Sequence, residues 1–135
     1  MKIGVISDTH IPFTAPNLPR KVREYFRKCD LIVHAGDIVD SSVIEDLEDM
    51  AETKAVAGNM DNEYLKKHLP KKLLFEVEGK KIGVMHGSGA PRKAKDIVEK
   101  EFIMRIGLNI PSIMSFLQTT MTVFMVMANH CLQIC

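Results

Sequence analysis

The sequence has no tryptophan, only three cysteines and almost no excess of charge. Cys29, Cys131 and Cys135 are few and odd in number, which favours reduced thiols in a cytoplasmic protein over a disulfide framework. His130 lies beside Cys131, but this spacing matches no closed zinc site. A formal net charge of +1 gives no signal for a specific nucleic-acid partner. The chain begins directly with a strand-like segment, so we predict no secretory signal.

Charged residues are also missing from the C-terminal part of the chain. The last acidic residue is Glu101 and the last basic residue is Arg105. Segment 110–128 has the length of a membrane span, but polar residues dilute it, so we expect no membrane attachment. Two other interpretations of residues 102–135 remain open. The tail completes the folded core, or the reading frame shifts near residue 102 and the tail was never selected to fold here.

Residues 1–101 alternate between strand-like and helix-like segments and form one predicted domain. Short apolar runs predict strands at 3–6, 31–35, 54–57, 71–78 and 81–85, and helical spacing predicts helices after Pro19, around 40–50 and after Pro91. Ser42 and Glu45 predict a capping box for the second helix, with Asp40 as the alternative cap. We therefore expect a layered α/β fold with a partly parallel sheet and an antiparallel hairpin between residues 71 and 86.

Polar side chains follow most of these strands. Asp8 and His10 follow the first strand, Asp37 the second, Asn59 the third and His86 the fifth. Side chains alternate along an extended segment, so Asp8 and His10 are expected to point the same way. Ligands of open α/β sheets bind at the carboxyl ends of strands, so all five side chains are expected to converge.

Two carboxylates, an amide oxygen and two imidazoles suit Mn²⁺, Fe²⁺, Zn²⁺ or Ni²⁺. Two such ions can share a bridging carboxylate and a bridging water, acidify that water and clamp a phosphoryl group. Each residue also has a simpler explanation: Asp8 and Asp37 suit helix caps or turns, Gly58-Asn59 is a common turn, and His86 suits a hydrogen-bonded strand end. Because the pattern repeats at four strand ends, we favour the metal site.

Four ordered motifs carry a resemblance to a known family: Asp8-Thr9-His10, His34-Ala35-Gly36-Asp37, Gly58-Asn59-Met60-Asp61 and His86-Gly87. Over residues 1 to about 101 the chain resembles the calcineurin-like metallophosphoesterase superfamily, and its size is similar to the small bacterial and archaeal phosphodiesterase branch. The resemblance implies a four-layer α/β sandwich of the metallophosphoesterase type that hydrolyses small phosphoric esters. It implies that Asp8 and His10 bind one metal, that Asp37 bridges both, and that Asn59 and His86 bind the second.

The same resemblance implies two divalent cations as cofactors, with Mn²⁺ as the first choice and Ni²⁺, Fe²⁺ or Zn²⁺ as alternatives. Asp37, Asn59 and His86 are expected to act in catalysis as well as in metal binding. Arg92 and the lysine pairs 66–67, 71–72 and 80–81 are candidates for attracting an anionic substrate, although such pairs are more often solvated surface charges.

The chain departs from the family pattern at two places. Many members carry a histidine after the Gly-Asn pair that is thought to protonate the leaving oxygen, and here Met60 occupies this position. We therefore expect phosphodiesters to be preferred over alkyl monoesters. The family's Gly-His-x-His segment also has no counterpart in residues 102–135. If the codons of residues 124–128 are read two bases later, they permit the sequence hydrophobic-Tyr-Gly-His, which is the start of this missing segment. This supports the frame-shift interpretation, but the second histidine of the segment is not restored.

Two alternatives to an active enzyme follow from these departures. One is a non-catalytic protein-interaction scaffold on the same fold. The other is an inactive phosphoesterase, C-terminally truncated or altered, whose first metal is under-coordinated. The sequence does not predict an oligomeric state.

Overall fold

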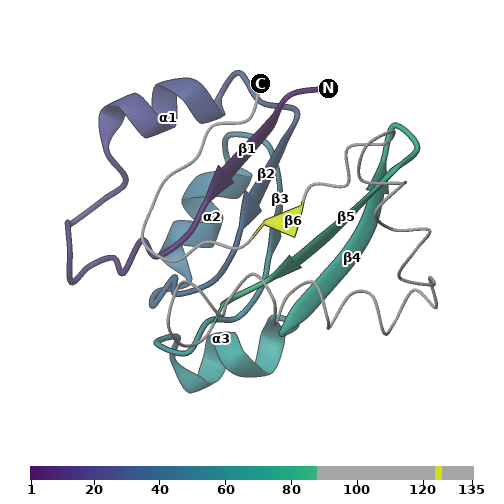
Figure 1. Ribbon diagram of the computed structural model, residues 1–135. Helices are drawn as coiled ribbons and strands as arrows, with labels where there is room; N and C mark the ends of the chain where they lie inside the picture. The colour runs from purple at the N-terminus through teal and green to yellow at the C-terminus, as the bar shows by residue number, and fades with distance from the viewer. Residues whose placement is uncertain (88–123, 126–135) are drawn as a thin grey trace.

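The computed structural model describes residues 1–87 and 124–125 of the 135-residue chain. Figure 1 shows α1 and α2 on one side of the sheet β1–β2–β3 and the β4–β5 hairpin on the other. In chain order the elements are β1 (Ile3–Ile6), α1 (Arg20–Phe26), β2 (Leu31–His34), α2 (Ser42–Glu48), β3 (Glu52–Ala55), α3 (Glu63–His68), β4 (Lys72–Val77), β5 (Lys80–Met85) and β6 (Phe124–Met125).

Strands β1, β2 and β3 form a parallel sheet with β2 in the middle. Successive side chains of a strand point to opposite faces. Ile32 of β2 belongs to the core beneath the helices, while Leu31 and Val33 belong to the core shared with the second sheet. All three are almost fully buried. Both faces of the sheet are covered, which explains why β2 reads as a continuous apolar run.

Strands β4 and β5 form an antiparallel hairpin, as predicted for residues 71–86. Glu78 and Gly79 both have positive φ at its turn, as two-residue hairpin loops of the common type require. Leu73, Phe75 and Val77 point from β4 into the inter-sheet core, and β6 pairs parallel with β5. The described residues thus build a helical layer and two sheets of the expected α/β sandwich.

The start of α2 differs from the prediction. Ser42 is already inside the helix, Ser41 is its N-cap, and no side chain caps the helix, so the Ser42–Glu45 capping box is wrong. The alternative cap, Asp40, accepts a hydrogen bond from the Ser42 amide at 2.9 Å. Hydrogen bonds from the side chain and backbone of Ser42 lower the pKa of Asp40. Asp40 therefore closes a turn before the helix instead of capping its first turn.

Helix α3 was not predicted from the apolar pattern, because Leu65 is its only buried residue. Its signal is the N-cap: the Asn62 side chain accepts a hydrogen bond from the Leu65 amide at 2.8 Å. The Asn62 amide group also donates to the Val39 carbonyl at 2.9 Å. Helix α3 is thereby anchored to the loop that follows β2.

Several sequence predictions fall outside the described residues. These are the helix after Pro91, the role of Arg92, the side chains of Lys80 and Lys81, and almost all of the tail 102–135. Within residues 1–87 and 124–125, no helix is long and apolar enough to span a membrane.

Candidate metal centre

The loop after β1 places Asp8 and His10 through an unusual backbone rather than an extended one. Both residues have positive φ, 54° and 46°, as does Asp37 after β2 at 57°. This left-handed conformation is uncommon outside glycine, and such residues gather at functional sites. The Asp8 amide donates to the Gly36 carbonyl at 3.0 Å and the His10 amide to the Asp37 carbonyl at 3.1 Å. The expectation of an extended Asp8–His10 segment is therefore wrong.

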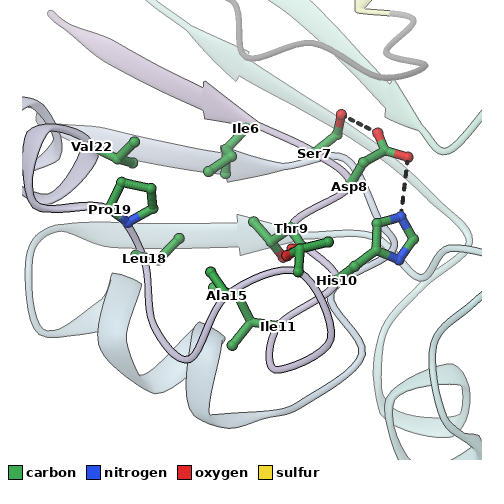
Figure 2. Close-up of a pocket in the computed structure, with 11 residues that line it drawn as sticks. Ile6, Ser7, Asp8, Thr9, His10, Ile11, Ala15, Leu18, Pro19 and Val22 are labelled. Atoms are coloured by element: carbon green, nitrogen blue, oxygen red, sulfur yellow. Dashed lines mark hydrogen bonds and ion pairs between the residues drawn. The ribbon is translucent and has the colours of Figure 1, made fainter.

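Asp8, His10 and Asp37 nevertheless converge on one point. One ligand atom from each lies within 4.8 Å of the others. His10 Nε2 is 3.8 Å from Asp8 Oδ1 and 3.7 Å from Asp37 Oδ2. The hydroxyl of Ser7 donates to Asp8 Oδ2 and holds this carboxylate in place (Figure 2). These three atoms could hold a metal ion and form one half of the candidate centre.

His86, from the end of β5, builds the other half around the same carboxylate. Its Nε2 is 3.4 Å from Asp37 Oδ2 and 2.9 Å from Asn59 Oδ1. Its Nδ1 lies 2.9 Å from the carbonyl oxygen of Ala35, which can only accept, so this nitrogen carries the proton. In the neutral ring, Nε2 then presents a lone pair to two oxygen acceptors. Nε2 and the two oxygens that it faces are then all acceptors, and such a mixed set of nitrogen and oxygen atoms is one that borderline divalent metals prefer.

Asp37 joins the two halves. Its Oδ2 faces both His10 and His86, while its Oδ1 accepts a hydrogen bond from the Met60 amide at 2.8 Å. The side chain is only 6% exposed. One carboxylate oxygen is therefore fixed by the backbone and the other is directed to the space between the two histidines.

Asp61 holds the loops that carry these ligands, a role that the sequence analysis missed. Its carboxylate is buried and accepts three backbone hydrogen bonds, from Ile38 at 2.5 Å, Val39 at 2.7 Å and Gly58 at 2.7 Å. It thus ties the loop of Asp37 to the loop of Asn59. The signal was present as the last residue of the Gly58-Asn59-Met60-Asp61 motif.

Two glycines allow the loops to approach so closely. A Cβ atom on Gly58 would collide with the Asp37 side chain and backbone. A Cβ on Gly36, whose φ is +97°, would come within 2.8 Å of the His86 side chain. Glycine is required at both places, because the Asp37 backbone and side chain fill the space beside Gly58 and the His86 side chain fills the space beside Gly36.

His34 lies under the centre and is fully buried. Its Nδ1 accepts a hydrogen bond from the Gly36 amide at 3.2 Å, so Nε2 carries the proton and donates to the Thr9 hydroxyl at 3.1 Å. Burial lowers the pKa of His34 to about 4, against the opposing influence of Asp61 and Asp8. His34 is therefore a neutral structural histidine that links the two loops, not a metal ligand.

A cavity adjoins each half of the centre. The first, of about 470 Å³, has Asp8 and His10 at one end and the apolar residues Leu18, Pro19 and Val22 at the other (Figure 2). The second, of about 660 Å³, is lined by Ala57, Gly58, Asn59, Glu63, Lys66, Lys71, Lys72, Met85 and His86. The structure thus brings all five candidate ligands to one edge of the fold. Of the two cavities, the one beside Asn59 and His86 has lysines among its described lining residues.

Comparison with known proteins gives a consistent result. A model of the calcineurin-like phosphoesterase superfamily domain matches residues 1–105. A probable metallophosphoesterase of Methanothermobacter thermautotrophicus is 45% identical over 92 residues, covering 68% of this chain and 53% of the relative. One of Methanocaldococcus jannaschii is 48% identical over 87 residues, covering 64% and 43%. The chain spans about half the length of these curated relatives.

Solved structures share the fold. A Thermotoga maritima protein is 37% identical with a TM-score of 0.59, covering 75% of this chain and 65% of the other. A structure described as a novel archaeal phosphodiesterase is 28% identical with a TM-score of 0.57, covering 74% and 67%. Vps29 of Chaetomium thermophilum is 22% identical with a TM-score of 0.64, covering 78% and 56%, a likeness of fold alone.

Proposed function

The chain belongs to the calcineurin-like phosphoesterase superfamily, and on this premise we propose that it hydrolyses phosphodiesters with the help of two divalent cations. The observation that carries the proposal is the position of Asp37 Oδ2, which lies 3.7 Å from His10 Nε2 and 3.4 Å from His86 Nε2. A single carboxylate oxygen between two ring nitrogens is the arrangement that a bridging ligand needs. The curated relatives, both probable metallophosphoesterases, support the same reaction class.

Each cation would have ligands of mixed nitrogen and oxygen type. Asp8, His10 and Asp37 would hold the first, and Asp37, Asn59 and His86 the second. Bound there, two divalent ions would supply an acidified water as nucleophile and neutralise the charge of the phosphoryl oxygens. Mn²⁺ is our first choice, with Ni²⁺, Fe²⁺ and Zn²⁺ as alternatives, because this ligand set suits all four.

The protein groups themselves orient and fix the ligands. Ser7 holds the Asp8 carboxylate, the Ala35 carbonyl selects the His86 tautomer, and the Met60 amide holds Asp37. Such supporting contacts keep ligands in a productive geometry. None of these residues supplies an acid for the leaving oxygen.

Met60 determines the substrate preference in this proposal. Its side chain stands where related proteins carry a histidine, and the residue is 57% exposed. A thioether cannot donate a proton, so the leaving group must depart without that help. Esters with poor alkyl leaving groups are then disfavoured, and we propose phosphodiesters with acidic leaving groups as substrates.

A non-catalytic protein-interaction scaffold on the same fold would have no need for the five candidate metal ligands. All five candidate ligand side chains are present and assembled, and their supporting contacts are in place. This is why we favour catalysis.

The test is hydrolysis of bis(p-nitrophenyl) phosphate and p-nitrophenyl phosphate by the purified chain with Mn²⁺. We expect the diester to be cleaved faster, activity to vanish in EDTA, and Mn²⁺ to restore it. Two bound ions per chain are expected by elemental analysis. A clear preference for the monoester would contradict the proposal.

A matched variant addresses the leaving-group argument. Met60→His places an imidazole at the position of the missing acid, and a positioned general acid accelerates such steps by about a hundredfold or more. We expect the variant to gain monoester hydrolysis relative to diester hydrolysis. Met60→Gln, which has no acid of suitable pKa, is the control and should keep the original preference.

A further inference from the structure

The cavity beside Asn59 and His86 differs in charge from the one beside Asp8 and His10. Its described lining includes Lys66, Lys71 and Lys72, with Glu63 as the one acidic residue among them. The described residues that line the cavity beside Asp8 include no lysine or arginine. A volume of about 660 Å³ also lies within the range of small-molecule sites. The two cavities therefore differ in charge, and the one beside Asn59 and His86 is the more suitable for an anionic group.

The fold explains why these lysines share one cavity. Glu63 and Lys66 line the cavity from α3, whereas Lys67 of the same helix is exposed and is not among the lining residues. The Ala57 amide donates to the Pro70 carbonyl at 2.9 Å, which brings residue 71 next to the Gly58–Asn59 loop. Lys72 pairs with Met85, the residue before His86.

Within the part of the chain that the structure describes, Lys66 and Lys71 form no ion pair. These lysines add positive charge to the cavity that also contains Asn59 and His86. An anionic group entering beside His86 would be met by this excess of positive charge.

We propose that this cavity binds a second anionic group, of the phosphate class, carried on one arm of the phosphodiester substrate. Lys66 and Lys71 contact that group, with Lys72 beside them, while the scissile phosphodiester lies at Asn59 and His86. The substrate class is then a phosphodiester with an additional terminal phosphate, such as a phosphorylated dinucleotide. The assignment rests on the function proposed above.

The test measures binding rather than turnover. Thymidine 3′,5′-bisphosphate and thymidine 5′-monophosphate are titrated into the full chain by calorimetry, in EDTA and again with Mn²⁺. With Mn²⁺, when both phosphates have a site, charge-assisted contacts to the additional phosphate are expected to tighten binding of the bisphosphate by about tenfold. In EDTA this ratio should fall, because Asp37 then repels the phosphate beside it and the single phosphate of the monophosphate can occupy the lysine cavity. The Lys66→Gln/Lys71→Gln variant should lose most of this ratio. Lys67→Gln, on the same helix but outside the cavity, should keep it.

The outcomes separate the two proposals. Equal affinity of the unaltered chain for both nucleotides with Mn²⁺ would overturn the cavity assignment. An equal loss in Lys67→Gln would overturn it as well, because that would indicate general attraction by net charge. A retained tenfold ratio with no hydrolysis of bis(p-nitrophenyl) phosphate would refute the diesterase and leave the anion-binding cavity standing. Circular dichroism of each variant establishes that the ratio is compared between folded proteins.

Discussion

Removal of the buried imidazole of His34 should change how the stability of the protein depends on pH. The pKa of His34 is about 4 in the folded chain and 6.5 when the group is solvated. Between these values the unfolded chain binds a proton that the folded chain does not, so stability falls as pH falls from above 6.5 toward 4. The full shift corresponds to about 3 kcal/mol, and about 2 kcal/mol of it is lost between pH 8 and pH 5.

His34→Gln removes the titrating group and leaves an amide able to donate toward Thr9. Urea unfolding in EDTA at pH 8 and pH 5 gives the loss of stability for each protein. We expect the unaltered chain to lose about 2 kcal/mol more than His34→Gln, although the variant is less stable at pH 8. His68→Gln is the control, because His68 is exposed on α3. If His34→Gln kept the full pH slope, or if His68→Gln removed it, the assignment of a buried neutral His34 would be wrong.

Three further predictions concern the metal centre. Asp8→Ala removes the Asp8 carboxylate from the group of Asp8, His10 and Asp37. Diester hydrolysis should fall to background, and the metal content should fall from two ions to one. Unchanged turnover would refute the site. Gly58→Ala should destabilise the chain by about 1–3 kcal/mol in urea unfolding and release metal, because the new methyl group displaces Asp37. Gly79→Ala is the control, because a Cβ at this turn position meets nothing within 4 Å. Its positive φ should still lower the free energy of unfolding by about 1–2 kcal/mol, and the metal should be retained. Asp61→Asn should cost about 2 kcal/mol and weaken Mn²⁺ binding measured by titration, because one backbone donor then faces an amide instead of an oxygen.

The sequence predicts which candidate ligands converge better than it predicts the backbone that carries them. Asp37 and Asn59 follow strands of one parallel sheet, whose carboxyl ends meet at one edge. His86 was singled out by the same pattern of a polar residue after a strand, although its strand belongs to the second sheet. The positive φ values of Asp8 and His10 were not predicted, because they depend on hydrogen bonds to the Gly36 and Asp37 carbonyls, far away in sequence. Periodicity describes regular segments, and these loops are not regular.

Helix α3 and the role of Asp61 were not predicted, because both depend on local hydrogen bonds and not on an apolar pattern. Helix α3 buries only Leu65, so its evidence is the Asn62 cap and not an amphipathic stripe. Asp61 resembles an ordinary turn residue until its three backbone donors are seen. Lys66 rather than Lys67 lines the cavity, and this difference was not predicted because α3 was not recognised from the sequence.

The two halves of the centre depend on different parts of the fold. Asp8, His10 and Asp37 lie on loops that hydrogen-bond to one another and follow strands of the same parallel sheet. His86 comes from the second sheet, and its position depends on its contact with the Ala35 carbonyl and on the packing of β5 against the first sheet.

Val84 is fully buried between the sheets, two residues before His86. A substitution at Val84 should therefore change the position of His86 without moving Asp8 or His10. Val84→Ala should leave a cavity that allows β5 to shift, with a loss of about 1–3 kcal/mol in stability. The second metal should be lost at lower chelator concentration than the first, because Asp8 and His10 do not move with β5. Equal loss of both ions would contradict this expectation and would mean that Asp37, whose Oδ2 faces both His10 and His86, couples the two halves.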